Sequence, residues 1–321
     1  AKMGYGYWAL ATQYVLYIPV NTLLMWHYSD WRPTLHFNFE PIKRLFPFSF
    51  KIMLSAIVTQ LNANIMNLIL GRYYGERNTG YYNQAYMWSS KCFLLVQNMV
   101  KQVDQAVLVG LDDECKRQLQ ELRKVMRFTA FVSFPLLLGL ALVSHEFIVL
   151  AIKEKWAYSA SLLPLLCLSG AFMPLSGLLT DAVISHRRSD IYLWNTLVLG
   201  LCEIVALLLL WPYGLRTMVV VYVVLNISWV FVWHFFVRRL MGYGLWAFLK
   251  DTIPFLLVAT FTMGATWLAT SSITQLPLLL AARIVIAALL YYAVMRCLHV
   301  QILDDCLQFV RRFRIGRKGT S

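Results

Sequence analysis

Residues 71–111 constrain this chain most, because the stretch is long enough to cross a bilayer yet carries charged side chains along its length. A lysine or aspartate at the middle of a bilayer costs roughly 2.5 to 3.5 kcal/mol on insertion scales. The stretch contains Lys91, Lys101 and Asp104. Its polar side therefore has to face water or other helices, which predicts a helix that borders a hydrated cavity.

Five polar residues of this stretch recur at steps of three, four and seven, which gathers them on one side of an α-helix. Apolar residues such as Tyr86, Phe93, Leu94 and Val100 fall largely on its other sides. We take the polar set as candidate substrate-binding residues: Gln84, Lys91, Asn98, Gln102 and Gln105.

The composition is that of a membrane protein, with 59% hydrophobic, 15% aromatic and 14% charged residues. The net charge of +13 comes from short basic clusters between apolar runs, a pattern that argues against a nucleic-acid partner. The 6 cysteines are scattered without a CxxC pair, so neither a disulfide framework, a metal site nor a cofactor is expected.

The apolar runs predict an all-α, polytopic transmembrane bundle. About 20 apolar residues are needed to cross the hydrocarbon core, and short links make consecutive helices antiparallel neighbours. We expect about nine spans, near 5–26, 48–70, 80–110, 126–151, 159–184, 190–211, 215–237, 251–270 and 277–297.

The basic residues indicate an orientation. Most of the 29 Lys and Arg residues fall on the side of the 27–47 loop, which places that side and the C-terminus in the cytoplasm. An odd number of spans with an outside start suggests that earlier helices precede Ala1. Two amphipathic cytoplasmic segments, 112–127 and 300–321, are expected to lie flat at the interface, and the second ends in a basic run.

Several runs carry a family resemblance: LGRYYGERNTGYYNQAY, FTAFVSFPLLLGLALVSHEFIVLAIKEKWAYSASLLPLLCLSG and SHRRSDIYLWN. They resemble the Wzx-type flippases, which are polysaccharide and lipopolysaccharide biosynthesis exporters of the multidrug, oligosaccharidyl-lipid and polysaccharide superfamily. Members have two lobes. The resemblance implies that 1–47 is the last helix of a first lobe with a cytoplasmic linker, that 48–299 is a second lobe of eight helices, and that 300–321 is the basic tail.

The resemblance further implies a transporter that is not an enzyme. Its cargo would be an undecaprenyl-diphosphate-linked oligosaccharide, flipped across the bacterial cytoplasmic (inner) membrane by alternating access for cell-surface polysaccharide or lipopolysaccharide synthesis. Membrane lipids are implied partners, and polysaccharide polymerase and chain-length machinery are further candidates. A diphosphate needs cations, and sugars need amide and hydroxyl groups in place of hydrocarbon.

Lys91 is the candidate for the diphosphate. The alternatives are that its ammonium snorkels to the interface or pairs with carbonyls of a neighbouring helix. Asn64 and Asn67 share a helical face with Gln60, with Asn62 turned away from it, and such amides either line a cavity or bridge helices. We include Asn64 and Asn67 among the substrate-binding candidates.

Two carboxylates, Asp181 and Glu203, are candidates for ion coupling, and each could instead lie near a helix end. Lys101 and Asp104, three residues apart, are expected to neutralise each other. Arg283 lies near the start of the last span and is expected to snorkel to the outer surface.

Three other functions fit the sequence less well. A polymerase, ligase or glycosyltransferase needs a large loop with general acids or bases, whereas the outward loops here are short and hold no carboxylate pair or histidine cluster. A multidrug exporter of the same superfamily needs an anionic cavity, and the 71–111 stretch argues for an anionic cargo instead. A scaffold that does not transport is a further alternative.

Overall fold

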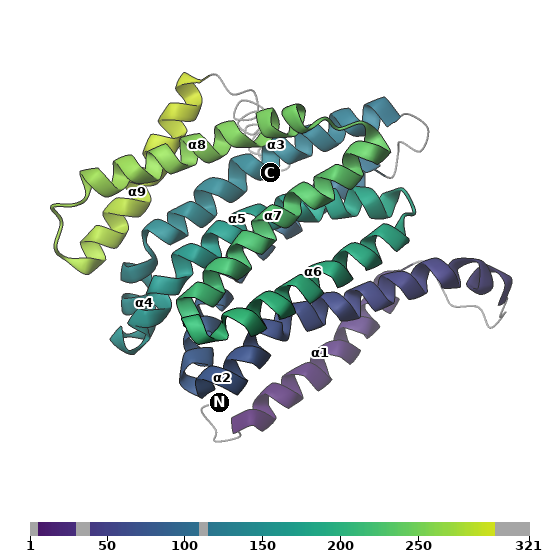
Figure 1. Ribbon diagram of the computed structural model, residues 1–321, viewed down its shortest axis with the longest axis horizontal. Coiled ribbons are helices and arrows are strands. Elements are labelled where there is room, and N and C mark those ends of the chain that lie inside the picture. The colour runs from purple at the N-terminus through teal and green to yellow at the C-terminus, as the bar shows by residue number, and fades with distance from the viewer. Residues whose placement is uncertain (1–5, 30–38, 109–114, 299–321) are drawn as a thin grey trace. The chain divides into compact units, whose positions relative to one another are not determined.

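The computed structural model describes residues 6–29, 39–108 and 115–298, and every regular element within these ranges is helical (Figure 1). In chain order the helices are α1 (Gly6–Tyr28), α2 (Phe39–Leu108), α3 (Cys115–Leu142), α4 (Ser144–Ile152), η1 (Glu154–Trp156), α5 (Ala157–Ser185), α6 (Ser189–Leu210), η2 (Trp211–Tyr213), α7 (Leu215–Met241), α8 (Leu245–Ala269) and α9 (Leu276–Cys297).

The chain divides into two compact units, Ala1–Pro47 and Phe48–Ser321. The described part of the first unit consists of α1, which contains Pro19, and the first turns of α2. The second unit contains the rest of α2 and all later helices, and the candidate site lies within it.

Helix α2 is broken at Gly75. A straight helix of its 70 residues would be about 105 Å long, more than three times the roughly 30 Å hydrocarbon core. Gly75 interrupts it with φ 76° and ψ 175°, a conformation that is essentially restricted to glycine. The break separates a first arm, residues 48–74, from a second arm, residues 76–108, and each arm is long enough to span a membrane.

Replacing Gly75 by alanine is expected to destabilise the protein by about 1–3 kcal/mol, the usual cost of a strained backbone conformation. A Cβ at Gly75 would meet no atom within 4 Å, so the effect comes from the backbone alone. Gly71 offers a matched control, since a Cβ there also meets nothing within 4 Å and its φ is not positive. Thermal denaturation in detergent should show a lower midpoint for G75A and no loss for G71A.

The second unit is a bundle in which α3 packs against α5 and α8, and α5 packs against α7 (Figure 1). Helix α6 lies beside α7, and α8 and α9 form a hairpin at one edge. The core at these contacts is apolar and fully buried, as at Phe134, Leu163, Leu175 and Val219.

Polar side chains join helices within this core. Ser89 donates to the carbonyl of Leu166 at 3.0 Å, and Ser133 donates to that of Ala171 at 2.8 Å. Small hydroxyl residues suit such positions because they let backbones approach closely while satisfying a carbonyl.

Two expected boundaries are wrong. The expected span 126–151 does not exist as one helix, because α3 ends at Leu142 and α4 begins at Ser144. The segment expected to lie flat at 112–127 is instead, from Cys115 onward, the first half of α3. Its apolar stripe is buried in the core, with Leu122 and Met126 3% and 0% exposed, because neighbouring helices cover it.

Seven helices of the described ranges are long and apolar enough to cross a membrane, and the first, Ser49–Lys101, includes the break at Gly75. The protein is therefore an all-α, multi-pass membrane bundle, as its composition predicts. The 300–321 tail lies outside the described residues.

Candidate functional site

The second arm of α2 presents a mixed polar and apolar surface. Lys91 and Asn98 are exposed on it, and Gln84 is half-buried. The Lys91 ammonium lies 4.5 Å from the centre of the Trp88 ring, a cation–π contact. Leu94 is 46% exposed, so the expectation that it lies away from the polar side is wrong. The exposed side holds an amide and an ammonium between apolar side chains.

The C-terminal part of this arm is described only as backbone. Gln102 and Gln105 continue α2, but their side chains lie outside the described residues, and the same holds for Asp104. The expected neutralisation of Lys101 by Asp104 therefore stays a prediction. Lys101 itself is exposed, and its charge acts on Asp181 of α5.

Amides of the first arm serve different purposes. Asn64 is exposed and donates to the carbonyl of Gln60 one turn earlier, at 2.8 Å. Asn67 is half-buried, and its side-chain oxygen is enclosed without a hydrogen-bond donor among the described residues. Asn62 bridges helices, since its amide donates to the Thr196 carbonyl of α6 at 3.0 Å.

Glu203 is a buried carboxylate in the middle of α6, only 3% exposed. Asn226 of α7 donates to it at 2.9 Å, and Tyr82 and Tyr86 of α2, stacked with ring centres 5.8 Å apart, lie within its electrostatic reach. Among the described carboxylates that are buried, Glu203 alone has no arginine or lysine at ion-pair distance. The other candidate, Asp181, is half-buried near the end of α5.

Arg283 does not snorkel to the surface, so that expectation is wrong. It is 9% exposed and donates to Glu146 at 2.8 Å, to the Leu142 carbonyl at 3.1 Å and to the Thr270 hydroxyl at 3.3 Å. Glu146 of α4 is itself 5% exposed. These acceptors satisfy the guanidinium inside the protein, so it has no need to reach water.

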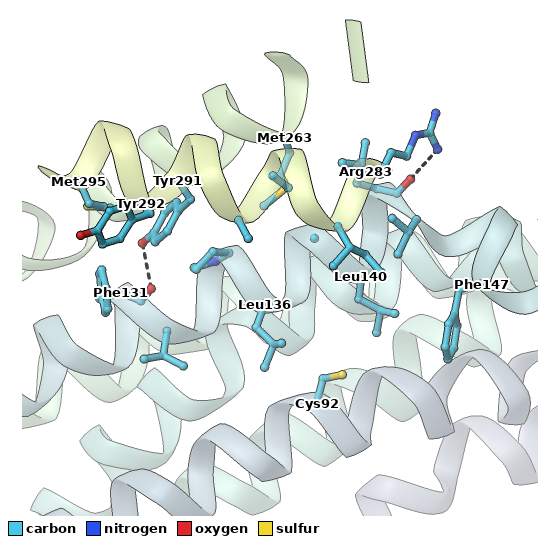
Figure 2. Close-up of a pocket in the computed structure, with 18 residues that line it drawn as sticks. Cys92, Phe131, Leu136, Leu140, Phe147, Met263, Arg283, Tyr291, Tyr292 and Met295 are labelled. Atoms are coloured by element: carbon cyan, nitrogen blue, oxygen red, sulfur yellow. Dashed lines mark hydrogen bonds between the residues drawn. The ribbon is translucent and has the colours of Figure 1, made fainter. Parts of the chain in front are cut away.

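An apolar pocket of about 610 Å³ lies between α3, α4, α8 and α9, with Cys92 of α2 on the opposite side from α9 (Figure 2). Among the described residues that line it, Arg283 is the only charged one. Tyr291 of α9 donates to the Phe131 carbonyl of α3 at 2.9 Å. A lining of this kind suits a hydrocarbon chain and would leave a sugar without hydrogen-bond partners.

A third polar cluster centres on Asp251 of α8, which is 3% exposed. Arg123 of α3 donates to both carboxylate oxygens, at 2.7 and 3.2 Å, and the Tyr243 hydroxyl donates at 2.9 Å. Burial, together with the neighbouring carboxylate, raises the pKa of Tyr243 well above its usual range, which keeps its hydroxyl protonated. Arg127 approaches to 3.8 Å. The cluster ties α3 to α8 and to the link before α8.

The apolar pocket and the Asp251 cluster were not expected from the sequence. Asp251 and Arg123 are separated by 128 positions, and helical periodicity relates residues only within one helix. One signal was available for the pocket, because Pro135 lacks an N–H and leaves the Phe131 carbonyl in need of a donor. No group of three His, Cys, Asp or Glu is placed to hold a metal ion in the described part of the chain.

Residues 1–161 match a family model described as "Polysaccharide biosynthesis protein". The chain is 27% identical over 191 residues to the lipopolysaccharide biosynthesis protein WzxC of Escherichia coli (strain K12), covering 58% of this chain and 39% of the relative. It is 26% identical over 241 residues to the teichuronic acid biosynthesis protein TuaB of Bacillus subtilis (strain 168), covering 74% and 50%.

Among solved structures the fold resembles that of the lipid II flippase MurJ in an inward closed conformation. The TM-score is 0.62 at 14% identity, over 83% of this chain and 57% of that one. The chain thus spans half or less of the length of the two curated relatives described above. The likeness to MurJ concerns the fold, since the sequence identity is low.

Proposed function

Because this chain belongs to the polysaccharide biosynthesis protein family, we propose that it acts in a flippase that moves a lipid-linked oligosaccharide across the bacterial cytoplasmic membrane. The cargo we propose is an undecaprenyl-diphosphate-linked repeat unit for cell-surface polysaccharide or lipopolysaccharide. The role is that of a transporter and not of an enzyme.

The observation that carries this proposal is the exposed ammonium of Lys91 on a helix that crosses the membrane. No described carboxylate lies at ion-pair distance from it, so its charge is available to an anion. An unpaired cation at membrane depth is costly unless water or a ligand surrounds it. A diphosphate is a suitable counter-ion, and Gln84 and Asn98, with Asn64, Asn67, Gln102 and Gln105, would offer amides to the sugars.

The apolar pocket suits the other end of such a cargo. It is lined by hydrocarbon and aromatic side chains, and Cys92, which borders it, is the residue next to Lys91. Successive residues on a helix point about 100° apart. The second arm of α2 therefore presents the Lys91 ammonium on one side and borders the pocket with Cys92 on another. We propose that the first isoprenyl units of the lipid occupy this pocket while the diphosphate stays near Lys91.

We further propose the orientation indicated by the basic residues, with the C-terminus in the cytoplasm. In that orientation Arg123 and Asp251 lie toward the cytoplasmic surface, and the break at Gly75 lies toward the opposite surface. Membrane lipids are partners by necessity, and polysaccharide polymerase and chain-length machinery are the protein partners we propose.

Glu203 is the residue we propose for coupling transport to a proton or cation, with Asp181 second. A buried carboxylate without a basic partner is stable only when it is neutral or holds a cation. Replacing Glu203 by glutamine keeps the hydrogen-bonding shape but removes the charge. Transport by E203Q is therefore expected to lose the acceleration that an imposed pH or sodium gradient gives the parent protein. Glu154, exposed in η1, provides the control E154Q, which should respond as the parent does.

The direct test is reconstitution of the intact protein in liposomes that contain fluorescent undecaprenyl-diphosphate oligosaccharide. Crossing is measured as the fraction of fluorophore that becomes accessible to a membrane-impermeant quencher. We expect crossing above that of protein-free liposomes, and much less with a drug-like organic cation as cargo. Equal crossing with and without protein would refute the flippase proposal.

A further inference from the structure

Helix α9 contacts α3 through two hydrogen bonds to main-chain carbonyls, one at each end of the apolar pocket (Figure 2). At one end the Tyr291 hydroxyl donates to Phe131, and at the other the Arg283 guanidinium donates to Leu142. Both acceptors belong to α3, and both donors are long side chains of α9. The pocket lies between these two contacts.

Each carbonyl is one that α3 itself leaves without a donor. The Phe131 carbonyl would accept from residue 135 in a regular helix, but Pro135 has no N–H to donate. The Leu142 carbonyl is at the end of α3, where the last carbonyls of a helix lose their intrahelical partners. Arg283 also pairs with Glu146 of α4, so the same side chain holds both sides of the α3–α4 junction. The two α9 side chains thus satisfy groups that are costly to bury unpaired.

The α9 residues that line the pocket midway between the two contacts, Ala287 and Ala288, have small side chains. Arg283, Ala287 and Tyr291 are spaced four residues apart, so they form one stripe on the buried face of the helix. Ala287 lies midway, and Gly139 of α3 also lines the pocket. The small side chain of Ala287 between the two large ones of Arg283 and Tyr291 therefore leaves an open space between the two contacts.

We propose that Arg283 and Tyr291 are positioning residues, which hold α9 at a fixed spacing from α3 and so keep the pocket between them shaped for one apolar chain. The class of ligand, a polyprenyl chain, rests on the proposed function; the positioning role does not. Loss of either contact lets α9 move as a wall of the pocket, which exposes the opposite side.

Cys92 reports this motion, because it lines the pocket on the side opposite α9 (Figure 2). The test uses the intact protein with Cys92 as its single cysteine, in vesicles of phosphatidylethanolamine and phosphatidylglycerol, alkylated with N-ethylmaleimide at constant pH. Tyr291→Phe removes one hydroxyl and keeps the ring. We expect alkylation of Cys92 to become about fivefold faster, the population shift that loss of one net hydrogen bond gives.

Tyr292→Phe is the matched control. Tyr292 is the next residue, lines the same pocket and has no hydrogen-bond partner among the described residues. Alkylation in Y292F should match the parent. The second contact is tested with the charge-neutral pair Arg283→Gln and Glu146→Gln, which leaves no buried charge alone, and it should accelerate alkylation at least as much as Y291F. Rates in Y291F and in the Gln pair that equal those of Y292F would overturn the positioning role.

The same experiment also tests the class of ligand separately. Undecaprenyl phosphate added to the vesicles should slow alkylation of Cys92 in the parent protein, and protection should be weaker in Y291F. Absence of protection in the parent would remove the polyprenyl chain from the pocket, and with it that part of the proposed function, while leaving the effect of Y291F on the rate intact.

Discussion

Replacing Lys91 by alanine is expected to slow flipping of undecaprenyl-diphosphate oligosaccharide about 10- to 100-fold. A hydrogen bond between charged partners contributes roughly 1.5–3 kcal/mol, and the ammonium of Lys91 is the described cation best placed to meet a diphosphate on α2. Lys91→Arg keeps the charge and should retain most of the rate. The measurement is the initial rate of crossing in liposomes that contain equal amounts of folded protein.

The control for loss of a positive charge is Lys250→Ala. Lys250 is exposed at the start of α8, outside the proposed site, and its removal should leave the rate within about twofold of the parent, since exposed charges contribute little. If the lipid-linked oligosaccharide crosses at the parent rate with both K91A and K250A, Lys91 has no part in transport. Its ammonium would then simply rest on the Trp88 ring.

Replacing Asp251 by alanine is expected to cause the largest loss of stability, roughly 2–4 kcal/mol. Removing one partner of a buried ion pair leaves the charge of the other partner unpaired. In D251A the buried Tyr243 hydroxyl also loses its hydrogen-bond acceptor. The expected loss lies below the upper end of the usual range for a broken buried ion pair. The reason is that the Arg123 side chain is 37% exposed, so water can solvate its charge in the variant. Thermal denaturation in detergent measures the effect.

Asp190 gives a matched control, because it also accepts two hydrogen bonds from one arginine but on the surface. Its pair with Arg188 has both side chains nearly half exposed, at 43% and 49%. D190A should therefore leave the thermal midpoint almost unchanged, while D251A lowers it clearly. Equal midpoints for the two variants would mean that the Asp251 cluster does not hold α3 to α8.

The helical membrane bundle could be predicted from the sequence because its cause is local. Apolar runs of bilayer length specify spans, and the glycines near residue 75 indicate a break in α2. The boundaries of α3 could not be predicted in the same way. Its first half, Cys115 to Arg127, is polar enough to suggest an interfacial helix, and only its packing against other helices buries the apolar stripe.

Whether a charged residue is buried or exposed depends on partners that are distant in the sequence. Arg283 was expected at the surface because it lies close to the start of its own helix. Glu146, which binds it, is 137 positions earlier. A periodic pattern specifies which face of a helix a residue occupies, but not which residue of another helix it meets. The carbonyls freed by Pro135 and by the end of α3 explain the choice of partners once the helices are placed.

The candidate substrate residues were predicted from spacing, and the structure places only some of them. Lys91 and Asn98 share an exposed surface, and Gln84 is partly covered. Leu94, Leu95 and Met99 interrupt that surface, which is less polar than the spacing of Gln and Asn residues indicates. A role for these residues in binding stays a prediction until the accessibility of this surface to water is measured.

That accessibility is the most direct test of the whole account. In the intact protein, with its native cysteines replaced, single cysteines are introduced at Lys91 and Asn98 and, as a control, at Leu257 of α8, which is 62% exposed and apolar. A charged, membrane-impermeant methanethiosulfonate reacts only where water reaches. We predict rapid reaction at Lys91 and Asn98 and none at Leu257. If all three positions are equally unreactive, α2 faces lipid or a dry contact, and the account of a hydrated passage is contradicted.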